Sequence, residues 1–137
     1  MRTIKFRIWD NNKKRLETEY DDLLIDQDGD IKQFITSGYE PYLANIDNDS
    51  LIIEQFTGLK DSNEVEIYEG DIVEFRANYS SNPCGYMKAK VVITEYRLEL
   101  HSENGCVYDA NEETDEFPYA KCKVLGNIHK NKNLLKL

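Results

Sequence analysis

The sequence is short of the residue types that build disulfide frameworks and zinc sites. Among 137 residues it has only two histidines and three cysteines, Cys84, Cys106 and Cys122. The odd number of cysteines does not suit a set of paired disulfides, and none of them forms a Cys-x-x-Cys pair. We therefore expect reduced, structural thiols, with no cofactor and no assigned metal ligand.

Long apolar runs are also missing. No window approaches the roughly 20 apolar residues that a membrane span requires. The first ten residues, MRTIKFRIWD, alternate charged and apolar side chains and lack the apolar stretch of an export signal. We expect no membrane association and a cytoplasmic location.

Basic residues are outnumbered, since 26 Asp and Glu face 17 Lys and Arg and the net charge is −9. Non-specific nucleic-acid binding depends on Lys and Arg that neutralise phosphates, so this balance disfavours it. The acidic balance fits a basic protein partner, and it fits equally a surface that only favours solubility. A nucleic-acid site would have to use the one N-terminal group of basic and aromatic residues: Lys5, Arg7, Trp9, Lys13, Lys14 and Arg15.

What the sequence does contain is short apolar segments separated by turn residues, which is typical of a small β-barrel or sandwich. The stretch 55–75 shows the pattern best, because two turns and three strand-like runs fit within it. In its second turn Gly70 allows a sharp reversal and Asp71 can accept hydrogen bonds from turn N–H groups. A ligand role for Asp71 is the alternative to this turn role.

The first strand-like segment, residues 3–9, has a period of two, which indicates a half-buried strand. Ile4, Phe6 and Ile8 fall on one side and Trp9 on the other, beside Lys5 and Arg7. Trp9 is therefore a candidate for a contact surface, while packing inside a small core is the alternative that we favour.

Residues 26–30, Asp-Gln-Asp-Gly-Asp, resemble the start of a calcium loop but fail its requirements. Counted from Asp26, position 6 of the loop would be Ile31 and position 12 would be Ser37, where glycine and glutamate are needed. We expect a hairpin turn between the apolar runs 23–25 and 31–35, in which Gly29 supplies a positive φ.

The second half predicts further hairpins. Residues 76–87 form a long loop bracketed by Tyr79 and Tyr86, and aromatic residues on exposed loops often carry binding. Residues 88–100 alternate strongly and predict a strand that bends near Tyr96. Trp9, Tyr79 and Tyr86 make up the candidate contact surface.

The turn at 101–105 contains Asn104-Gly105, a strong hairpin signal. His101, Ser102 and Cys106 near it could be taken for catalytic parts. Catalysis requires a nucleophile, a base and an orienting group that meet in space, and adjacency in a turn does not supply that geometry. We therefore predict no catalytic residues.

Four segments in the same order resemble the YopX family of bacteriophage and prophage proteins: 4–10 (IKFRIWD), 56–61 (FTGLKD), 67–73 (IYEGDIV) and 124–129 (VLGNIH). His129 departs from the family, where a Tyr is common. The resemblance implies a mainly β protein with an SH3-like barrel in its C-terminal part, and it implies no activity. We expect an N-terminal hairpin-based part at 1–50, with a soft boundary, and the barrel at 51–137, ending in a short basic tail.

These observations favour a non-enzymatic binding or accessory module from a phage or prophage, acting on a protein partner in the host bacterial cytoplasm. A nucleic-acid-associated β-barrel is the alternative, and an enzyme ranks last. Whether the chain forms a homo-oligomer is left open.

Overall fold

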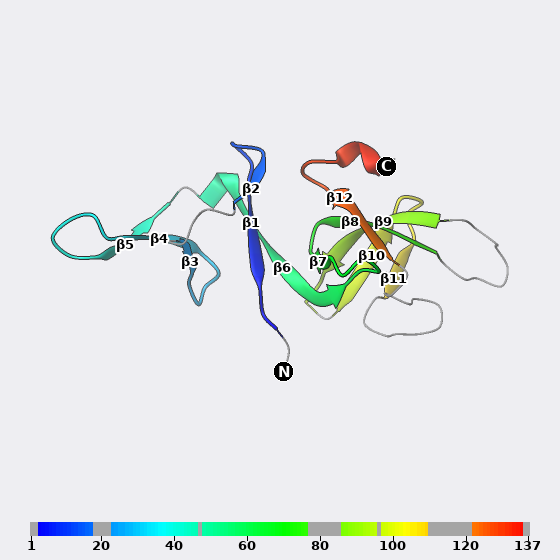
Figure 1. Cartoon of the computed structure of the whole chain (residues 1–137), viewed down its shortest axis with the longest axis horizontal. Coiled ribbons are helices and arrows are strands. Elements are labelled where there is room, and N and C mark those ends of the chain that lie inside the picture. The colour runs from blue at the N-terminus through cyan, green and yellow to red at the C-terminus, as the bar shows by residue number, and fades with distance from the viewer. Residues whose placement is uncertain are drawn as a thin grey trace. The chain divides into compact units, whose positions relative to one another are not determined.

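Figure 1 shows a computed structural model that describes residues 3–17, 23–46, 48–76, 86–95, 97–109 and 122–135. Within these ranges the regular structure is β-strand apart from two single 3-10 turns, η1 (Asn48–Ser50) and η3 (Lys132–Leu134). This confirms the prediction of a mainly β fold. The described residues include no helix long and apolar enough to cross a membrane. The strands are β1 (Phe6–Asp10), β2 (Arg15–Glu17), β3 (Leu23–Ile25), β4 (Ile31–Ile35), β5 (Tyr42–Asn45), β6 (Leu51–Lys60), β7 (Glu66–Tyr68), β8 (Asp71–Arg76), β9 (Tyr86–Ile93), β10 (Leu98–Ser102), β11 (Val107–Asp109) and β12 (Lys123–Asn127).

The strands form three sheets, and neighbouring strands within each sheet are antiparallel. Their orders are β2-β1-β6-β7, β11-β10-β9-β8-β12 and β3-β4-β5. Consecutive strands pair in most positions, as expected for hairpins joined by short turns. The pairings among the described residues give open sheets, one of them a half-barrel. The SH3-like barrel therefore stays a prediction.

The chain forms two compact units. One contains residues 8–53, and the other contains residues 1–7 together with residues 54–137. The chain passes from one unit to the other between residues 7 and 8 and again between residues 53 and 54. The boundary expected near residue 50 lies close to the second of these positions. The sequence pattern did not indicate that the first seven residues belong with the C-terminal unit.

The core of the C-terminal unit is built on β8, β9 and β10. Its buried cluster contains Ile67, Val73, Phe75, Ala89, Val91, Leu100, Tyr108 and Cys122. Ala89 and Val91 share the face that the alternation in residues 88–100 indicated. The predicted single strand is in fact two, because β9 ends at Ile93 and the chain reverses before β10 begins at Leu98. The hydroxyl of Thr94 accepts a hydrogen bond from the Arg97 N–H and so stabilises this reversal.

The N-terminal strand buries the opposite side from the one that its apolar residues suggest. Ile4 and Phe6 are 71% and 46% exposed, whereas the side chain of Arg7 is only 15% exposed. From apolar character alone, Ile4 and Phe6 would be expected to be buried and Arg7 to be exposed. Charge pairing with buried carboxylates, described below, explains the position of Arg7.

The turn between β3 and β4 confirms the hairpin prediction. Gly29 has a φ of +85°, and Oδ1 of Asp26 accepts hydrogen bonds from the N–H groups of Asp28 and Asp30, at 2.9 Å each. The carboxylate of Asp26 therefore stabilises the turn that was weighed against a calcium loop.

Asp61 fixes the turn between β6 and β7 and ties it to β12. Its Oδ1 accepts from the N–H groups of Asn63 and Val65, at 2.8 and 2.9 Å, and its Oδ2 accepts from the Val124 N–H at 2.9 Å. Burial works to raise the pKa of this carboxyl, but the three donors outweigh it and hold the pKa below its ordinary value.

We predict that Asp61→Asn lowers the free energy of unfolding by about 2 kcal/mol at pH 7, since an amide cannot accept at both ends. A lowered folded-state pKa means that the ionised carboxylate stabilises the fold above its unfolded pKa of about 3.9 and loses this effect as pH falls through the folded value. The difference from the wild type should therefore shrink between about pH 4 and pH 2 in urea titrations. Asp28→Asn, on an exposed turn, is the matched control. A difference that stays constant with pH would contradict the assignment.

Candidate functional site

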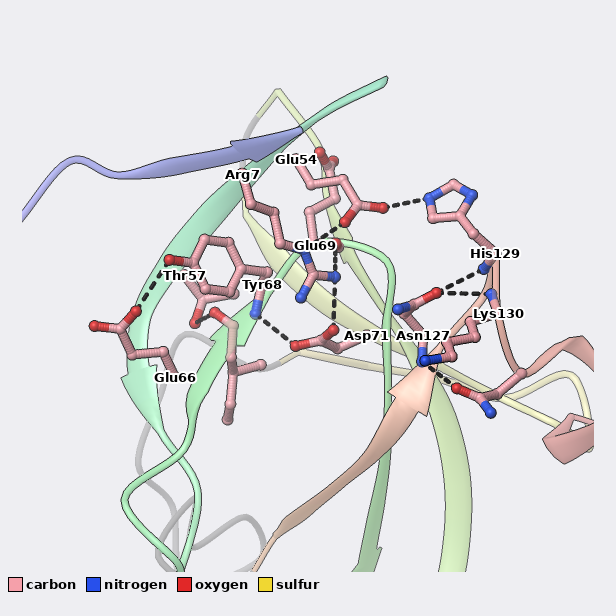
Figure 2. Close-up of polar contacts among 12 residues, drawn as sticks. Arg7, Glu54, Thr57, Glu66, Tyr68, Glu69, Asp71, Asn127, His129 and Lys130 are labelled. Carbon is pink, nitrogen blue, oxygen red and sulfur yellow. Dashed lines mark hydrogen bonds and ion pairs between the residues drawn. The ribbon is translucent and has the colours of Figure 1, made fainter. Parts of the chain in front are cut away.

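A group of charged side chains lies in the C-terminal unit, where four separate segments of the chain meet (Figure 2). We call Arg7, Glu54, Asp71 and His129 the buried charged cluster. Arg7 is at its centre. Its Nε donates to Glu54 Oε2 at 2.6 Å, and its Nη2 donates to Asp71 Oδ1 at 2.6 Å. The planar guanidinium suits this role because its donors point in fixed directions toward two acceptors.

Glu54 links Arg7 to the C-terminal turn. Its side chain is 3% exposed, and its second oxygen, Oε1, lies 2.5 Å from Nε2 of His129. An ionised carboxylate has no proton to give, so the imidazole Nε2–H is the donor. The turn that carries His129 is fixed by Asn127, whose Oδ1 accepts from the N–H groups of His129 and Lys130 at 3.0 and 2.8 Å.

Asp71 is buried at the start of β8, with its side chain 3% exposed. Burial raises the pKa of this carboxyl, while the Tyr68 N–H, at 2.9 Å from Oδ2, and the Arg7 guanidinium work to lower it. The nearby Glu69 carboxyl also has a raised pKa because it is desolvated. Removing water from carboxylates is costly, so Asp71 remains acceptable here chiefly because its oxygens have donors.

Tyr68 covers one side of the cluster. The Arg7 guanidinium carbon lies 4.7 Å from the centroid of the Tyr68 ring, which is cation–π distance. The Tyr68 hydroxyl donates to Glu66 at 3.0 Å, and Glu66 pairs with Lys5 at 2.6 Å. The aromatic ring therefore lies between the buried cluster and an exposed ion pair.

The arrangement is suited to holding segments together. All four side chains of the cluster are at most 15% exposed, and each makes a charge-assisted hydrogen bond to another member. Through these pairings the cluster joins the N-terminal segment, β6, β8 and the turn after β12.

The sequence analysis named Arg7 in a possible nucleic-acid site and His129 as a departure from the family, and it considered both a turn role and a ligand role for Asp71. It did not predict that these residues meet, and it did not identify Glu54. The structure shows the turn role through the Tyr68 N–H and adds the pairing with Arg7. One sequence signal for the cluster did exist: Glu54 interrupts the apolar run 51–56, LIIEQF. A carboxylate in a buried strand requires a cation, and Arg7 supplies it.

His101, Ser102 and Cys106 lie together, but in a hydrogen-bonded turn. The Ser102 hydroxyl donates to the Cys106 carbonyl at 2.9 Å and accepts from the Cys106 N–H at 3.1 Å, and it also contacts Asn104. His101 is directed to Glu99 at 2.7 Å. Ser102 is thus held in this turn by hydrogen bonds and is 3% exposed.

The structure also shows the surroundings of possible metal ligands and of two of the three cysteines. Among the described residues no group of three or more His, Cys, Asp and Glu is arranged to hold a metal ion. Cys122 is buried, and burial raises the pKa of its thiol to about 11, which leaves it protonated and unreactive at neutral pH. Cys106 is exposed, and Cys84 lies outside the described residues.

The three candidate contact residues have different surroundings. Trp9 is 1% exposed, which matches the packing alternative, so its side chain is not on a contact surface in this structure. Tyr86, the first residue of β9, is 70% exposed. Tyr79 lies outside the described residues.

An exposed apolar face that the sequence analysis did not identify lies on the sheet β3-β4-β5. Phe34 is directly opposite Leu43, and Leu24 is opposite Lys32, two residues from Phe34. Side chains alternate along a strand, so Leu24, Phe34 and Leu43 point to the same side of the sheet. They are 47%, 40% and 56% exposed. We call these three residues the exposed apolar face. The alternation of residues 31–35 places Phe34 opposite to Ile31 and does not say which of the two is exposed.

Comparisons with known proteins were made for the whole chain. The model of the family described as YopX protein matches residues 5–136. A solved structure, protein EF1440 from Enterococcus faecalis, is 24% identical with a TM-score of 0.58, and the match covers 98% of this chain and 99% of that one. The structure of protein yopX from Bacillus subtilis is 20% identical with a TM-score of 0.60, with the same coverage of both chains.

A search of curated proteins gives no match. The two solved structures share the fold with this chain over nearly their full length. The family model spans almost every residue, and it includes three of the four segments of the resemblance in full and the first, 4–10, from residue 5. On this basis, the chain belongs to the YopX family.

Proposed function

We propose that this chain is a non-enzymatic binding module, encoded by a phage or prophage, that acts on a protein partner in the cytoplasm of a bacterial host. The observation that carries the proposal is the exposed apolar face, Leu24, Phe34 and Leu43, on a three-stranded sheet. Clustered exposed apolar side chains are costly in water and mark surfaces that other molecules cover. The family resemblance supports the phage or prophage origin, and the run β10-β9-β8-β12 supports an SH3-like barrel for residues 51–137.

The two groups of residues that most resemble a catalytic site, the buried charged cluster and the turn at Ser102, also support a non-enzymatic role. The buried charged cluster has its polar groups paired within the fold, and the turn at Ser102 uses its hydroxyl for the backbone. These two sets of described residues thus make hydrogen bonds that support the fold, which agrees with a binding module.

Nothing specific favours the nucleic-acid alternative. Lys5 pairs with Glu66, Arg7 with Glu54 and Asp71, and both Lys13 and Arg15 lie within 4 Å of Glu17. Basic groups that are already paired within the protein offer less charge to phosphates.

The test places a photo-crosslinking amino acid at Leu43, or at Val107 as a control that is equally exposed, at 52%, on β11 of the other unit. We expect a discrete protein adduct from Leu43, and none from Val107, in lysate of the bacterium that carries the gene. Mass spectrometry would identify the adduct. If no position on the exposed apolar face captures a protein above the Val107 background, the proposed function is wrong.

A further inference from the structure

The exposed apolar face has a defined geometry. Phe34 and Leu43 are direct cross-strand neighbours, and Leu24 is diagonal to Phe34, so the three apolar side chains form a row on one side of β3, β4 and β5. Lys32, directly opposite Leu24, lies on the same side as this row. On the other side of the sheet Ile31 is buried at 1% exposure, whereas Tyr42, which pairs with Ile35, is 54% exposed.

The unit that carries this row is strongly acidic. Residues 8–53 contain eleven Asp and Glu and four Lys and Arg, a net charge of −7 out of the −9 of the whole chain. The turn at one end of the sheet carries three exposed or half-buried acids, Asp26, Asp28 and Asp30, and the loop at the other end carries the exposed Glu40. The apolar row thus has acidic residues at both ends of its strands.

Lys32 is the one basic side chain on the strands that form the row. Its ammonium group lies 2.5 Å from Oδ1 of Asn45 on the neighbouring strand. Because Asn45 is neutral, this contact does not pair Lys32 with a carboxylate, and the unit keeps its excess of acidic residues.

This charge decides between the two kinds of occupant that an apolar sheet face can have. A second copy of the chain would bring a unit of −7 against a unit of −7, and such like charges repel at the ionic strengths of a cell, where screening extends over about 8 Å. A partner with basic residues around an apolar centre would gain both burial and charge pairing.

We propose that the face formed by Leu24, Phe34 and Leu43 docks a protein partner whose contact surface presents apolar side chains surrounded by Lys and Arg. This inference rests on the proposed function and adds the chemistry of the partner. The apolar row supplies affinity, and the acidic ends of the sheet select basic over acidic partners.

The experiment measures binding of two synthetic peptides to the full chain by fluorescence anisotropy. One peptide alternates Lys with Leu or Phe, and the other has Glu in place of every Lys. We expect the Lys peptide to bind and the Glu peptide to fail, with affinity for the Lys peptide falling as salt is raised to about 0.15 M and beyond.

Variants assign the binding to the face. Phe34→Ser/Leu43→Ser should weaken binding of the Lys peptide at least about tenfold, since each buried apolar side chain contributes about 1.5–3 kcal/mol. Val107→Ser, the same kind of change on an exposed residue elsewhere, should leave affinity within about twofold. Asp28→Asn/Glu40→Gln should flatten the salt dependence. Leu43→Lys adds a repelling charge at one exposed position and serves if the double serine variant does not fold.

The proposal is overturned by any of three results: no binding of the Lys peptide, equal binding of both peptides, or unchanged binding by the face variants. It is also overturned if sedimentation shows a dimer that Phe34→Ser/Leu43→Ser dissolves, because the occupant is then a second copy. Capture of an acidic protein through Leu43 would overturn this inference and leave the proposed function standing. Failure of capture at the face overturns the proposed function itself.

Discussion

Replacing Arg7 with Met is expected to lower the free energy of unfolding by about 3–5 kcal/mol at neutral pH, because it leaves two buried carboxylates without their cation. Glu54 and Asp71 each receive a 2.6 Å hydrogen bond from the guanidinium, and each side chain is 3% exposed. Met keeps much of the volume of Arg and can still pack on the Tyr68 ring, so the loss is one of charge. Urea unfolding followed by circular dichroism measures it.

The pH dependence distinguishes this effect from a packing defect. Burial already raises the pKa of Asp71, and removing Arg7 removes one of the groups that oppose that rise. A raised folded-state pKa means that the group favours the fold below its unfolded pKa and that this contribution is lost as pH rises through the folded value. The penalty of Arg7→Met should therefore be largest near pH 7 and smaller near pH 4.

Three controls accompany this variant. Lys5→Met removes the exposed pair with Glu66, at 47% and 32% side-chain exposure, and should lower the free energy of unfolding far less than Arg7→Met does. Arg7→Lys keeps the charge and loses the two-way geometry, so it should recover part of the stability. Adding Glu54→Gln and Asp71→Asn to Arg7→Met should recover more. A penalty no greater than that of Lys5→Met would show that the cluster does not hold the segments together.

The parts of this fold that the sequence predicts are those determined by neighbours along the chain. The Asp-Gly turn after β3 and the Asn104-Gly105 turn after β10 depend on local backbone preferences, and both hairpins are present.

The parts that the sequence does not predict depend on partners far along the chain. Arg7 meets Glu54, Asp71 and, through Glu54, His129, at separations of 47 and 64 residues, with 75 between Glu54 and His129. A period-two pattern states which residues share a side of a strand and leaves open which side is buried. For residues 3–9 the sequence alone would assign the apolar side, with Ile4 and Phe6, to the core. Pairing with Glu54 and Asp71, which are distant in the sequence, places Arg7 on the buried side instead. Trp9 is buried on that side of the alternation too.

The sequence also leaves open which side of β4 carries the exposed apolar face. Alternation in β4 places Ile31 and Phe34 on opposite sides, and both are apolar. Only the packing of the N-terminal unit shows that Ile31 is the covered residue and Phe34 the open one, at 1% and 40% exposure. Apolar residues on both sides of a short sheet therefore leave the choice of the buried side open to the sequence.

Gly70 should be sensitive to substitution because it lies against the buried charged cluster. Its φ is +82°, and a Cβ built on it would collide with Oε1 of Glu54. A flexible side chain would normally swing away. Glu54 cannot do so without cost, because His129 holds that same oxygen and Arg7 holds the other. The backbone is fixed as well, since the Gly70 N–H donates to the Val91 carbonyl and its own carbonyl accepts from the Ile128 N–H, both at 2.9 Å.

Gly70→Ala is therefore expected to lower the free energy of unfolding by about 3 kcal/mol, of which about 1 kcal/mol is the cost of a positive φ for alanine. Gly58→Ala isolates that part, because Gly58 has a φ of +85° and nothing within 4 Å of the added Cβ. Urea unfolding of the two variants gives the difference, and the excess of about 2 kcal/mol measures the displaced carboxylate. Adding Glu54→Ala to Gly70→Ala creates space for the methyl group, so its cost relative to Glu54→Ala alone should fall to that of Gly58→Ala. Equal losses for Gly70→Ala and Gly58→Ala would mean that Glu54 moves freely and that the buried charged cluster does not constrain the turn.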